Sequence, residues 1–263
     1  MTRILRQEDG FSLAELMVVC AIVGIIAAGI LGVSQVSLQS YLRANALENA
    51  QTGARAGLAR MTADLRMLGS CWEGATGSGP TITAATTATS ITFIGDVDGD
   101  TLDNNGNENT LAAAAVAGDT AITVTRSTGM NGRPAFAVGA YACLKSGGAW
   151  EVRQITAVAG TTITLAVALA TNFPAGSTVR SVQTVTYALV GTTLTRSVNG
   201  GAAAVIANGV SGLTFTYLDG QNPPVVTGVL GNIRQVQVSL TTTGANGAVR
   251  VMNTTVRPRS LSL

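Results

Sequence analysis

The stretch Phe11–Val33, FSLAELMVVCAIVGIIAAGILGV, decides the fold of the first part of the chain. It holds a single charged side chain, Glu15, within an otherwise apolar run. A helix rises about 1.5 Å per residue, so a helix of this length crosses the roughly 30 Å hydrocarbon core of a bilayer. The sequence therefore predicts a transmembrane helix over residues 11–33.

The residues on either side of this stretch predict its orientation. The preceding segment, MTRILRQEDG, is short and polar and carries Arg3 and Arg6, whereas a long polar region follows. By the positive-inside rule the N-terminus stays in the cytoplasm, and residues from about 40 onward are exported across the inner membrane. A secretory signal is the alternative, but it would have a shorter apolar core followed by its cleavage site and no acidic group inside it.

The junction between the two segments carries a motif. Gly10 ends the basic leader, Phe11 begins the apolar run, and Ser12-Leu13-Ala14-Glu15 follows. This pattern resembles the cleavage and methylation motif of type IV prepilins and pseudopilins. The resemblance implies that prepilin peptidase cuts between Gly10 and Phe11, removing residues 1–10. It also implies N-methylation of Phe11 and packing of the helix against other pilins or pseudopilins in a filament.

Glu15 is the candidate assembly residue. A carboxylate inside a membrane is costly and usually marks a functional partner. In the resembling family the matching glutamate pairs with the N-terminal amine of a neighbouring subunit, which neutralises two buried charges. A protonated Glu15, or one that reaches the cytoplasmic interface, stays an open alternative.

The helix is predicted to continue past the membrane as an amphipathic segment over residues 34–70. The apolar positions that support this recur at helical spacing; they are Leu47, Ala54, Leu58, Met61, Leu65 and Leu68. Arg60 and Asp64 stand at helical pairing distance. No proline or turn cluster interrupts the run before Gly69, so we expect one helix from Phe11 to Leu68 whose second half lies against the exported domain.

Residues 71–263 are predicted to form a β-rich head, because glycine, threonine and short β-branched runs dominate. The expected strands are Ser90–Ile94, Ala121–Thr125, Tyr141–Leu144, Trp150–Ile155, Thr162–Val167, Ser181–Leu189, Thr193–Ser197, Leu213–Leu218, Arg234–Leu240 and Arg250–Val256. The predicted fold class is α+β, with a long N-terminal helix packed on an antiparallel sheet.

A weak internal repeat suggests an insertion in this head. AVAGDTAITVT, from Ala115, returns as AVAGTTITLA, from Ala157. We predict a small β module over Leu111–Arg180, inserted into the head. The alternative is that a bias toward alanine and threonine creates the similarity.

The segments that flank the insertion carry a second resemblance. Segments starting at Val185, Thr193, Val210 and Ile233 look like the C-terminal sheet of PilW-like minor pilins and J-type pseudopilins. This implies a structural subunit that primes or joins a type IV pilus or a type II secretion pseudopilus. The alternative is a pilus-associated adhesin or another anchored, surface-binding β protein, for which deleting the module would abolish attachment but leave pilation intact.

Composition argues against two other classes of function. The chain has no histidine, the commonest general base and zinc ligand, which disfavours an enzyme. Charged residues make up 11% of the chain, the net charge is +2, and the basic residues are scattered. We therefore expect no nucleic-acid partner.

Two cysteines fall in the exported region. Cys71 and Cys143 could form a disulfide there. The sequence leaves their pairing open, because it does not show whether their Cα atoms approach.

An acidic run in the head offers oxygen ligands at alternate positions, as calcium loops do; its acidic members are Asp96, Asp98, Asp100 and Asp103. It departs from the EF-hand pattern, because Thr101 replaces the turn glycine and Asn107 the bidentate glutamate. A non-EF Ca²⁺ site and a solvated acidic turn both remain open.

Overall fold

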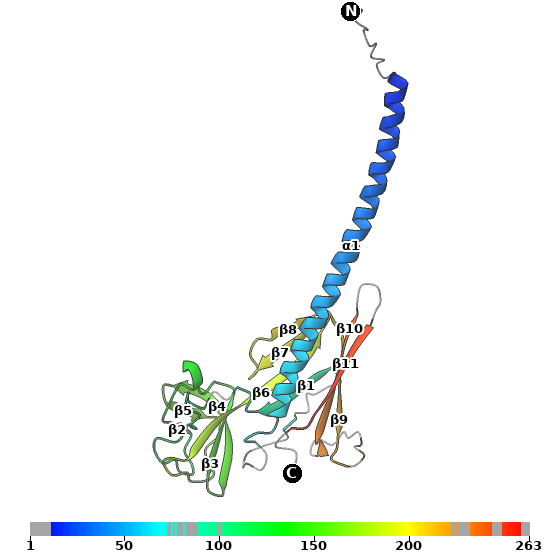
Figure 1. Ribbon diagram of the computed structural model, residues 1–263. Coiled ribbons are helices and arrows are strands. Elements are labelled where there is room, and N and C mark those ends of the chain that lie inside the picture. The colour runs from blue at the N-terminus through cyan, green and yellow to red at the C-terminus, as the bar shows by residue number, and fades with distance from the viewer. Residues whose placement is uncertain are drawn as a thin grey trace, which may run out of the picture. The chain divides into compact units, whose positions relative to one another are not determined.

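The computed structural model describes residues 12–72, 75, 77, 81–82, 89–98, 101–221, 223, 225, 232–243 and 249–258. The chain divides into two compact units, Met1–Glu48 and Asn49–Leu263. Helix α1, Leu13–Arg66, runs across the boundary, and the described strands all lie in the second unit (Figure 1).

Helix α1 confirms the predicted continuous helix, although it ends at Arg66 rather than at Leu68. Its 54 residues span about 81 Å at 1.5 Å per residue. The chain leaves the helix through Gly69, whose φ of 78° lies in the left-handed region that glycine adopts at little cost. The predicted start, Phe11, lies outside the described residues.

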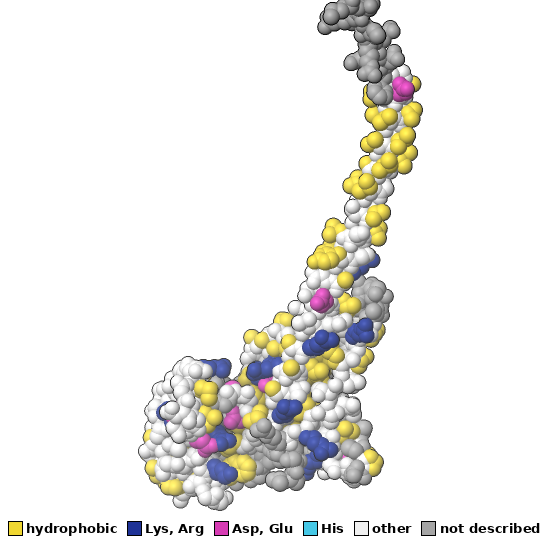
Figure 2. Space-filling view, viewed as in Figure 1, with side chains coloured by type: hydrophobic (Ala, Val, Ile, Leu, Met, Phe, Trp, Pro, Cys, Tyr) yellow, Lys and Arg dark blue, Asp and Glu magenta, His cyan; other side chains and the backbone are white. Residues whose placement is uncertain are grey.

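The first unit presents an apolar helical surface. Side chains from Leu13 to Leu42 are exposed, and Figure 2 shows the hydrophobic groups along this length. By length and composition, α1 can cross a membrane. These observations agree with the predicted transmembrane segment.

The second part of α1 buries one face in the head. The buried residues Ala54, Gly57, Met61, Asp64 and Leu65 recur at steps of three and four or lie side by side. Ala54, Met61 and Leu65 belong to the stripe expected from the sequence, whereas Gly57 and Asp64 are additions to it. Asp64 is an acid on the buried face, whereas its spacing from Arg60 predicted only an ion pair between the two.

The head contains eleven strands among the described residues, together with a short 3₁₀ turn, η1 (Met130–Gly132). The strands are β1 (Ser90–Gly95), β2 (Ala121–Thr123), β3 (Tyr141–Ser146), β4 (Ala149–Ala159), β5 (Thr162–Leu165), β6 (Thr178–Val190), β7 (Thr193–Val198), β8 (Ala204–Asn208), β9 (Val210–Leu218), β10 (Gln235–Thr243) and β11 (Val249–Val256). All ten predicted strands are present. The eleventh, β8, was missed because its alanine-rich sequence lacks the β-branched alternation of a typical strand.

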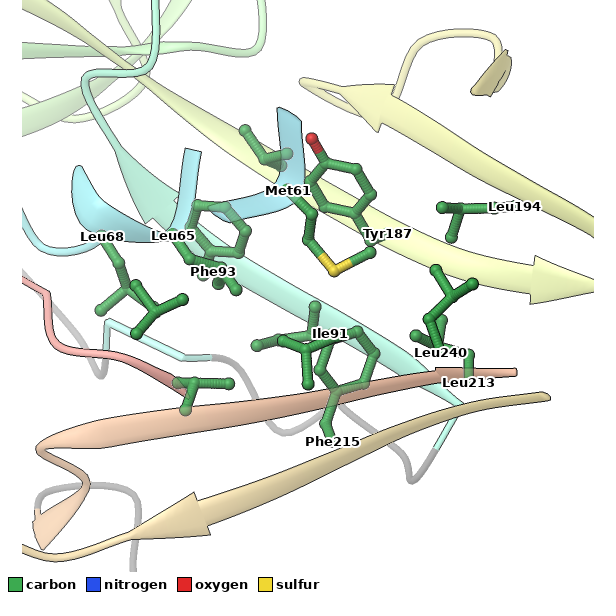
Figure 3. Close-up of a cluster of buried hydrophobic side chains, with 14 of the residues drawn as sticks. Met61, Leu65, Leu68, Ile91, Phe93, Tyr187, Leu194, Leu213, Phe215 and Leu240 are labelled. Carbon is green, nitrogen blue, oxygen red and sulfur yellow. The ribbon is translucent and has the colours of Figure 1, made fainter. Parts of the chain in front are cut away.

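Side chains of α1 and of two antiparallel sheets together form the first hydrophobic core. One sheet continues from β6 to β7 and β8, and β1 also pairs with β6; the other has the order β11-β10-β9. Figure 3 shows Met61 and Leu65 of α1 facing Phe93, Tyr187 and side chains of the second sheet. Burial of this many large apolar side chains is the main force that holds the helix on the sheets.

Glycine allows two close approaches in this core. A Cβ on Gly95 would lie 2.4 Å from the carbonyl oxygen of Met67, so only glycine lets β1 meet the end of α1 there. A Cβ on Gly57 would lie 3.0 Å from Leu194 and 3.2 Å from Ile206, side chains of β7 and β8. These two glycines therefore set how closely α1 lies on the first sheet.

A second core lies inside a small barrel. Strands β2, β5, β4, β3 and the start of β6 pair in that order. The segment around Thr110 and Leu111 then bridges Thr178 of β6 on one side and Val124, just after β2, on the other. This closes the ring of strands, which removes exposed sheet edges.

Among the residues that the structure describes, the barrel core draws only on those between Leu111 and Val179, such as Leu144, Ile163 and Phe173. A core of its own is what an inserted module needs, although the bounds Leu111–Arg180 stay a prediction. Strand β6 belongs to both the barrel and the first sheet, so no linker separates the two.

The internal repeat has a structural counterpart. The strands that follow its two AVAG segments are β2 and β5, and they pair with each other. Ile122 and Ile163 lie directly opposite in this ladder and are both buried. The two similar sequences therefore contribute adjacent strands of one barrel.

Candidate functional site

The start of α1 holds the residues that the motif singles out. The cleavage and methylation residues, Gly10 and Phe11, lie outside the described residues. The first described residue, Ser12, forms a reciprocal pair of hydrogen bonds with Glu15: the Ser12 amide donates to Glu15 Oε2 at 3.0 Å, and the Glu15 amide donates to Ser12 Oγ at 3.2 Å. This is a capping box, which satisfies two amides that the first turn of a helix leaves unpaired.

The capping box gives Ser12 a structural role that was not predicted from the motif. The signal was present, since Ser12-Leu13-Ala14-Glu15 has the serine-x-x-glutamate spacing of a capping box just before an apolar run. It holds the Glu15 carboxylate at the N-terminal end of the helix, where the helix dipole favours negative charge. The carboxylate thus accepts a hydrogen bond from the backbone amide of Ser12, the second residue after the predicted cleavage point in the sequence.

A buried ionic network fixes α1 on the first sheet. Asp64 Oδ2 accepts hydrogen bonds from the Tyr187 hydroxyl and from Arg196 Nε, each at 2.7 Å. Asp64 Oδ1 faces Arg60 Nε at 3.2 Å, which confirms the predicted pair. The Asp64 side chain is only 3% exposed, so these partners compensate a carboxylate that has left water.

Two pKa values respond to this network. Burial, followed by the charge of Asp64 and the hydrogen bond to it, raises the pKa of Tyr187 well above its ordinary value. Burial acts to lower the pKa of Arg196, but the hydrogen bond to Asp64 and its charge outweigh burial and raise that pKa. Both shifts favour the neutral tyrosine and charged arginine that the network requires.

Tyr187 makes the head sensitive to alkali. Above about pH 10 an unfolded tyrosine loses its proton whereas folded Tyr187 keeps it, so this group's contribution to the free energy of unfolding is full below that pH and falls as pH rises. We expect urea unfolding to show a larger loss of stability between about pH 8 and pH 11 for the wild type than for Tyr187→Phe. The other tyrosines are common to both proteins. Equal losses would contradict the assigned role of Tyr187.

Cys71 and Cys143 form a disulfide in this structure. Cys71 follows the end of α1, Cys143 lies on β3, and their Cα atoms are 6.3 Å apart, a usual separation for a disulfide. The bond ties the chain just after α1 to the outer face of the barrel. A small buried apolar cluster lies beside the bond and includes Trp72, Val152 and Val182.

The described members of the acidic run, Asp96, Asp98 and Asp103, do not come together as one ligand set. Asp103 accepts hydrogen bonds from the Asn105 and Asn107 amides, and Arg126 pairs with it at 3.5 Å. The hydrogen bonds from Asn107, followed by the one from Asn105 and the charge of Arg126, lower the pKa of Asp103. Asp103 therefore already has its positive partner.

The other members of the run have separate settings. The Asp96 amide bonds to Ser70, and Asp98 accepts a hydrogen bond from Gln183 at 2.8 Å. Asp100 lies outside the described residues. Within the described part of the chain, no group of three or more histidine, cysteine or acidic side chains is arranged to hold a metal ion.

Comparisons with known proteins identify the N-terminal motif. A family model described as the prokaryotic N-terminal methylation motif matches residues 5–31, which include Gly10, Phe11 and Glu15. Comparison with curated proteins and with solved structures gives no match. The motif, together with one long apolar helix packed on antiparallel sheets, supports a type IV pilin-like or pseudopilin-like protein with a membrane anchor.

Proposed function

We propose that the chain is a minor pilin or pseudopilin, a structural subunit without catalytic activity that primes or joins a type IV pilus or a type II secretion pseudopilus. The observation that carries this proposal is the methylation motif at the start of a single helix whose far end is built into a β head. One element thereby joins a membrane and filament anchor to a folded domain. The PilW-like or J-type subtype is part of the proposal and rests on the sequence resemblance of the C-terminal sheet.

The proposed life cycle follows from the motif. Before assembly the chain crosses the inner membrane once with its N-terminus in the cytoplasm. Prepilin peptidase removes residues 1–10, Phe11 is methylated, and the helix moves laterally into the filament, so that the head reaches the periplasm or cell surface. The exposed apolar side chains from Leu13 to Leu42 then contact the helices of neighbouring subunits.

Glu15 is proposed to act in that step. Its carboxylate is already held toward the helix start by the capping box. Cleavage creates an amine at Phe11, one residue before Ser12. The Glu15 carboxylate of one subunit pairs with this amine of another, which lowers the cost of keeping both charges in an apolar filament core.

The mature N-terminus tests the proposal most directly. We expect wild-type protein coexpressed with prepilin peptidase to begin at N-methylated Phe11, whereas Gly10→Ala protein stays uncut, because the substitution alters the cleavage site itself. Mass spectrometry of the intact protein and its N-terminal peptide measures both. An intact Met1 in both proteins, or cleavage beyond Val33, would overturn the prepilin assignment.

Calcium binding by Asp96, Asp98, Asp100 and Asp103 remains a separate proposal, supported by oxygen ligands in an exported head. Its expected result is a melting temperature that rises with added Ca²⁺ and falls back with a chelator. An unchanged melting temperature favours the solvated acidic turn.

A further inference from the structure

A pocket of about 240 Å³ opens on the outer face of the barrel, beside the disulfide. Its lining residues come from β3, β4, β6 and two neighbouring loops; they are Cys71, Glu108, Lys145, Trp150, Thr178 and Arg180. Neither the methylation motif nor the proposed filament role uses these side chains.

The pocket combines an aromatic wall with both signs of charge. Lys145 Nζ lies 5.2 Å from the centre of the Trp150 ring. Lys145 is the one lysine in the chain, and no carboxylate of the described residues forms an ion pair with it. Arg180 forms an ion pair with Glu108. The pocket therefore holds two cations, one anion and an indole.

The framework around the pocket fixes the indole. Lys145 and Trp150 are direct cross-strand partners in the β3–β4 ladder, and Lys145 also faces Thr178 of β6. The Trp150 indole N–H donates to Cys143 Sγ at 3.1 Å. A fixed aromatic wall lowers the ordering cost of binding.

These groups select a chemical class of ligand. An apolar wall suits the C–H face of a sugar ring, while Glu108 and Thr178 offer acceptors for its hydroxyl groups. The Lys145 ammonium and the Arg180 guanidinium suit a carboxylate. An inorganic anion would use only the cations, and a neutral sugar would leave Lys145 without an anionic partner.

We propose that this pocket binds an acidic monosaccharide unit of the uronic acid class, free or as part of a polysaccharide. Lys145 holds the carboxylate, Trp150 supports the ring, and Arg180 with Glu108 bonds to the hydroxyl groups. Exposed ion pairs and exposed cation–π contacts are each worth about 1 kcal/mol or less, so the ligand readily rearranges the contacts that these pocket side chains make with one another.

Calorimetric titration of the full chain in detergent micelles tests this proposal. The probes are galacturonic acid and galactose. Galacturonic acid has a carboxylate where galactose has a hydroxymethyl group. We expect saturable binding of galacturonic acid, weakened about tenfold or more by Lys145→Ala, because a hydrogen bond to a charged group is lost. Galactose should bind at least about tenfold more weakly than galacturonic acid for the same reason.

Arg250→Gln is the matched control, since it removes a positive charge from an exposed position of β11 that does not line the pocket. The affinity of the Arg250→Gln protein for galacturonic acid should equal that of the wild type. Lys145 is exposed, so Lys145→Ala should keep the wild-type melting temperature. No saturable heat with galacturonic acid, equal affinity for galactose, or equal losses in both variants would each overturn the proposal. The titration involves neither cleavage nor assembly, so its failure leaves the pilin proposal unaffected.

Discussion

Replacing Asp64 with alanine is expected to destabilise the head by about 3–5 kcal/mol, the usual cost of breaking a buried ion pair from one side. The substitution leaves Arg196, whose side chain is 15% exposed, without its counter-charge. It also leaves the fully buried Tyr187 hydroxyl without its acceptor. Urea unfolding of the full chain in detergent micelles, followed by circular dichroism, measures the loss.

Two variants separate this network from simple charge removal. Arg60→Ala should cost only about 0.3–0.5 kcal/mol, because Arg60 is 52% exposed and forms an ordinary helical pair with Asp64. Glu48→Ala removes an exposed acid from the same helix and should change stability by less than about 0.5 kcal/mol. An Asp64→Ala protein as stable as the Glu48→Ala protein would show that the network does not hold α1 on the sheet.

Local patterns predicted the elements of this fold. The apolar run from Phe11 and the stripe that ends at Leu68 indicated one long helix, and the helix found is Leu13–Arg66. Alternation of β-branched residues indicated ten strands at nearly their observed positions. These predictions succeed because helix and strand periods are set by residues close together in sequence.

Pairing over long distances could not be predicted in the same way. Closure of the barrel depends on Leu111 meeting Val124 and on Thr110 meeting Thr178, with no regular strand at the joint. The repeat at Ala115 and Ala157 showed that two strands are alike but not that they pair. Such contacts are fixed by packing of the whole core, which a local pattern does not contain.

The candidate sites show the same difference between local contacts and contacts over long sequence distances. Ser12 and Glu15 are three residues apart, so their capping box was available from sequence. Asp64 also lies on the apolar stripe, which marks it as unusual. Its partners Tyr187 and Arg196 are 123 and 132 residues away, and only the folded head identifies them.

Replacing both Cys71 and Cys143 with serine is expected to be the second large loss. The disulfide closes a loop of 72 residues, and the chain-entropy model assigns such a loop about 4 kcal/mol. The observed range for native disulfides, about 2–5 kcal/mol, brackets this value. Urea unfolding of the double variant, compared with the wild type under non-reducing conditions, measures it.

Cys20→Ser is the matched control, because Cys20 is a free, exposed cysteine on α1. It should leave the unfolding of the head unchanged, and a reductant should destabilise the wild type and the Cys20→Ser protein equally but not the double variant. A reductant effect that persists in the double variant would contradict the assigned disulfide. If the expected pattern holds, the disulfide from the end of α1 to β3 stabilises the head independently of the Asp64 network. The two losses should then add when combined, because the Asp64 network and the disulfide share no residue.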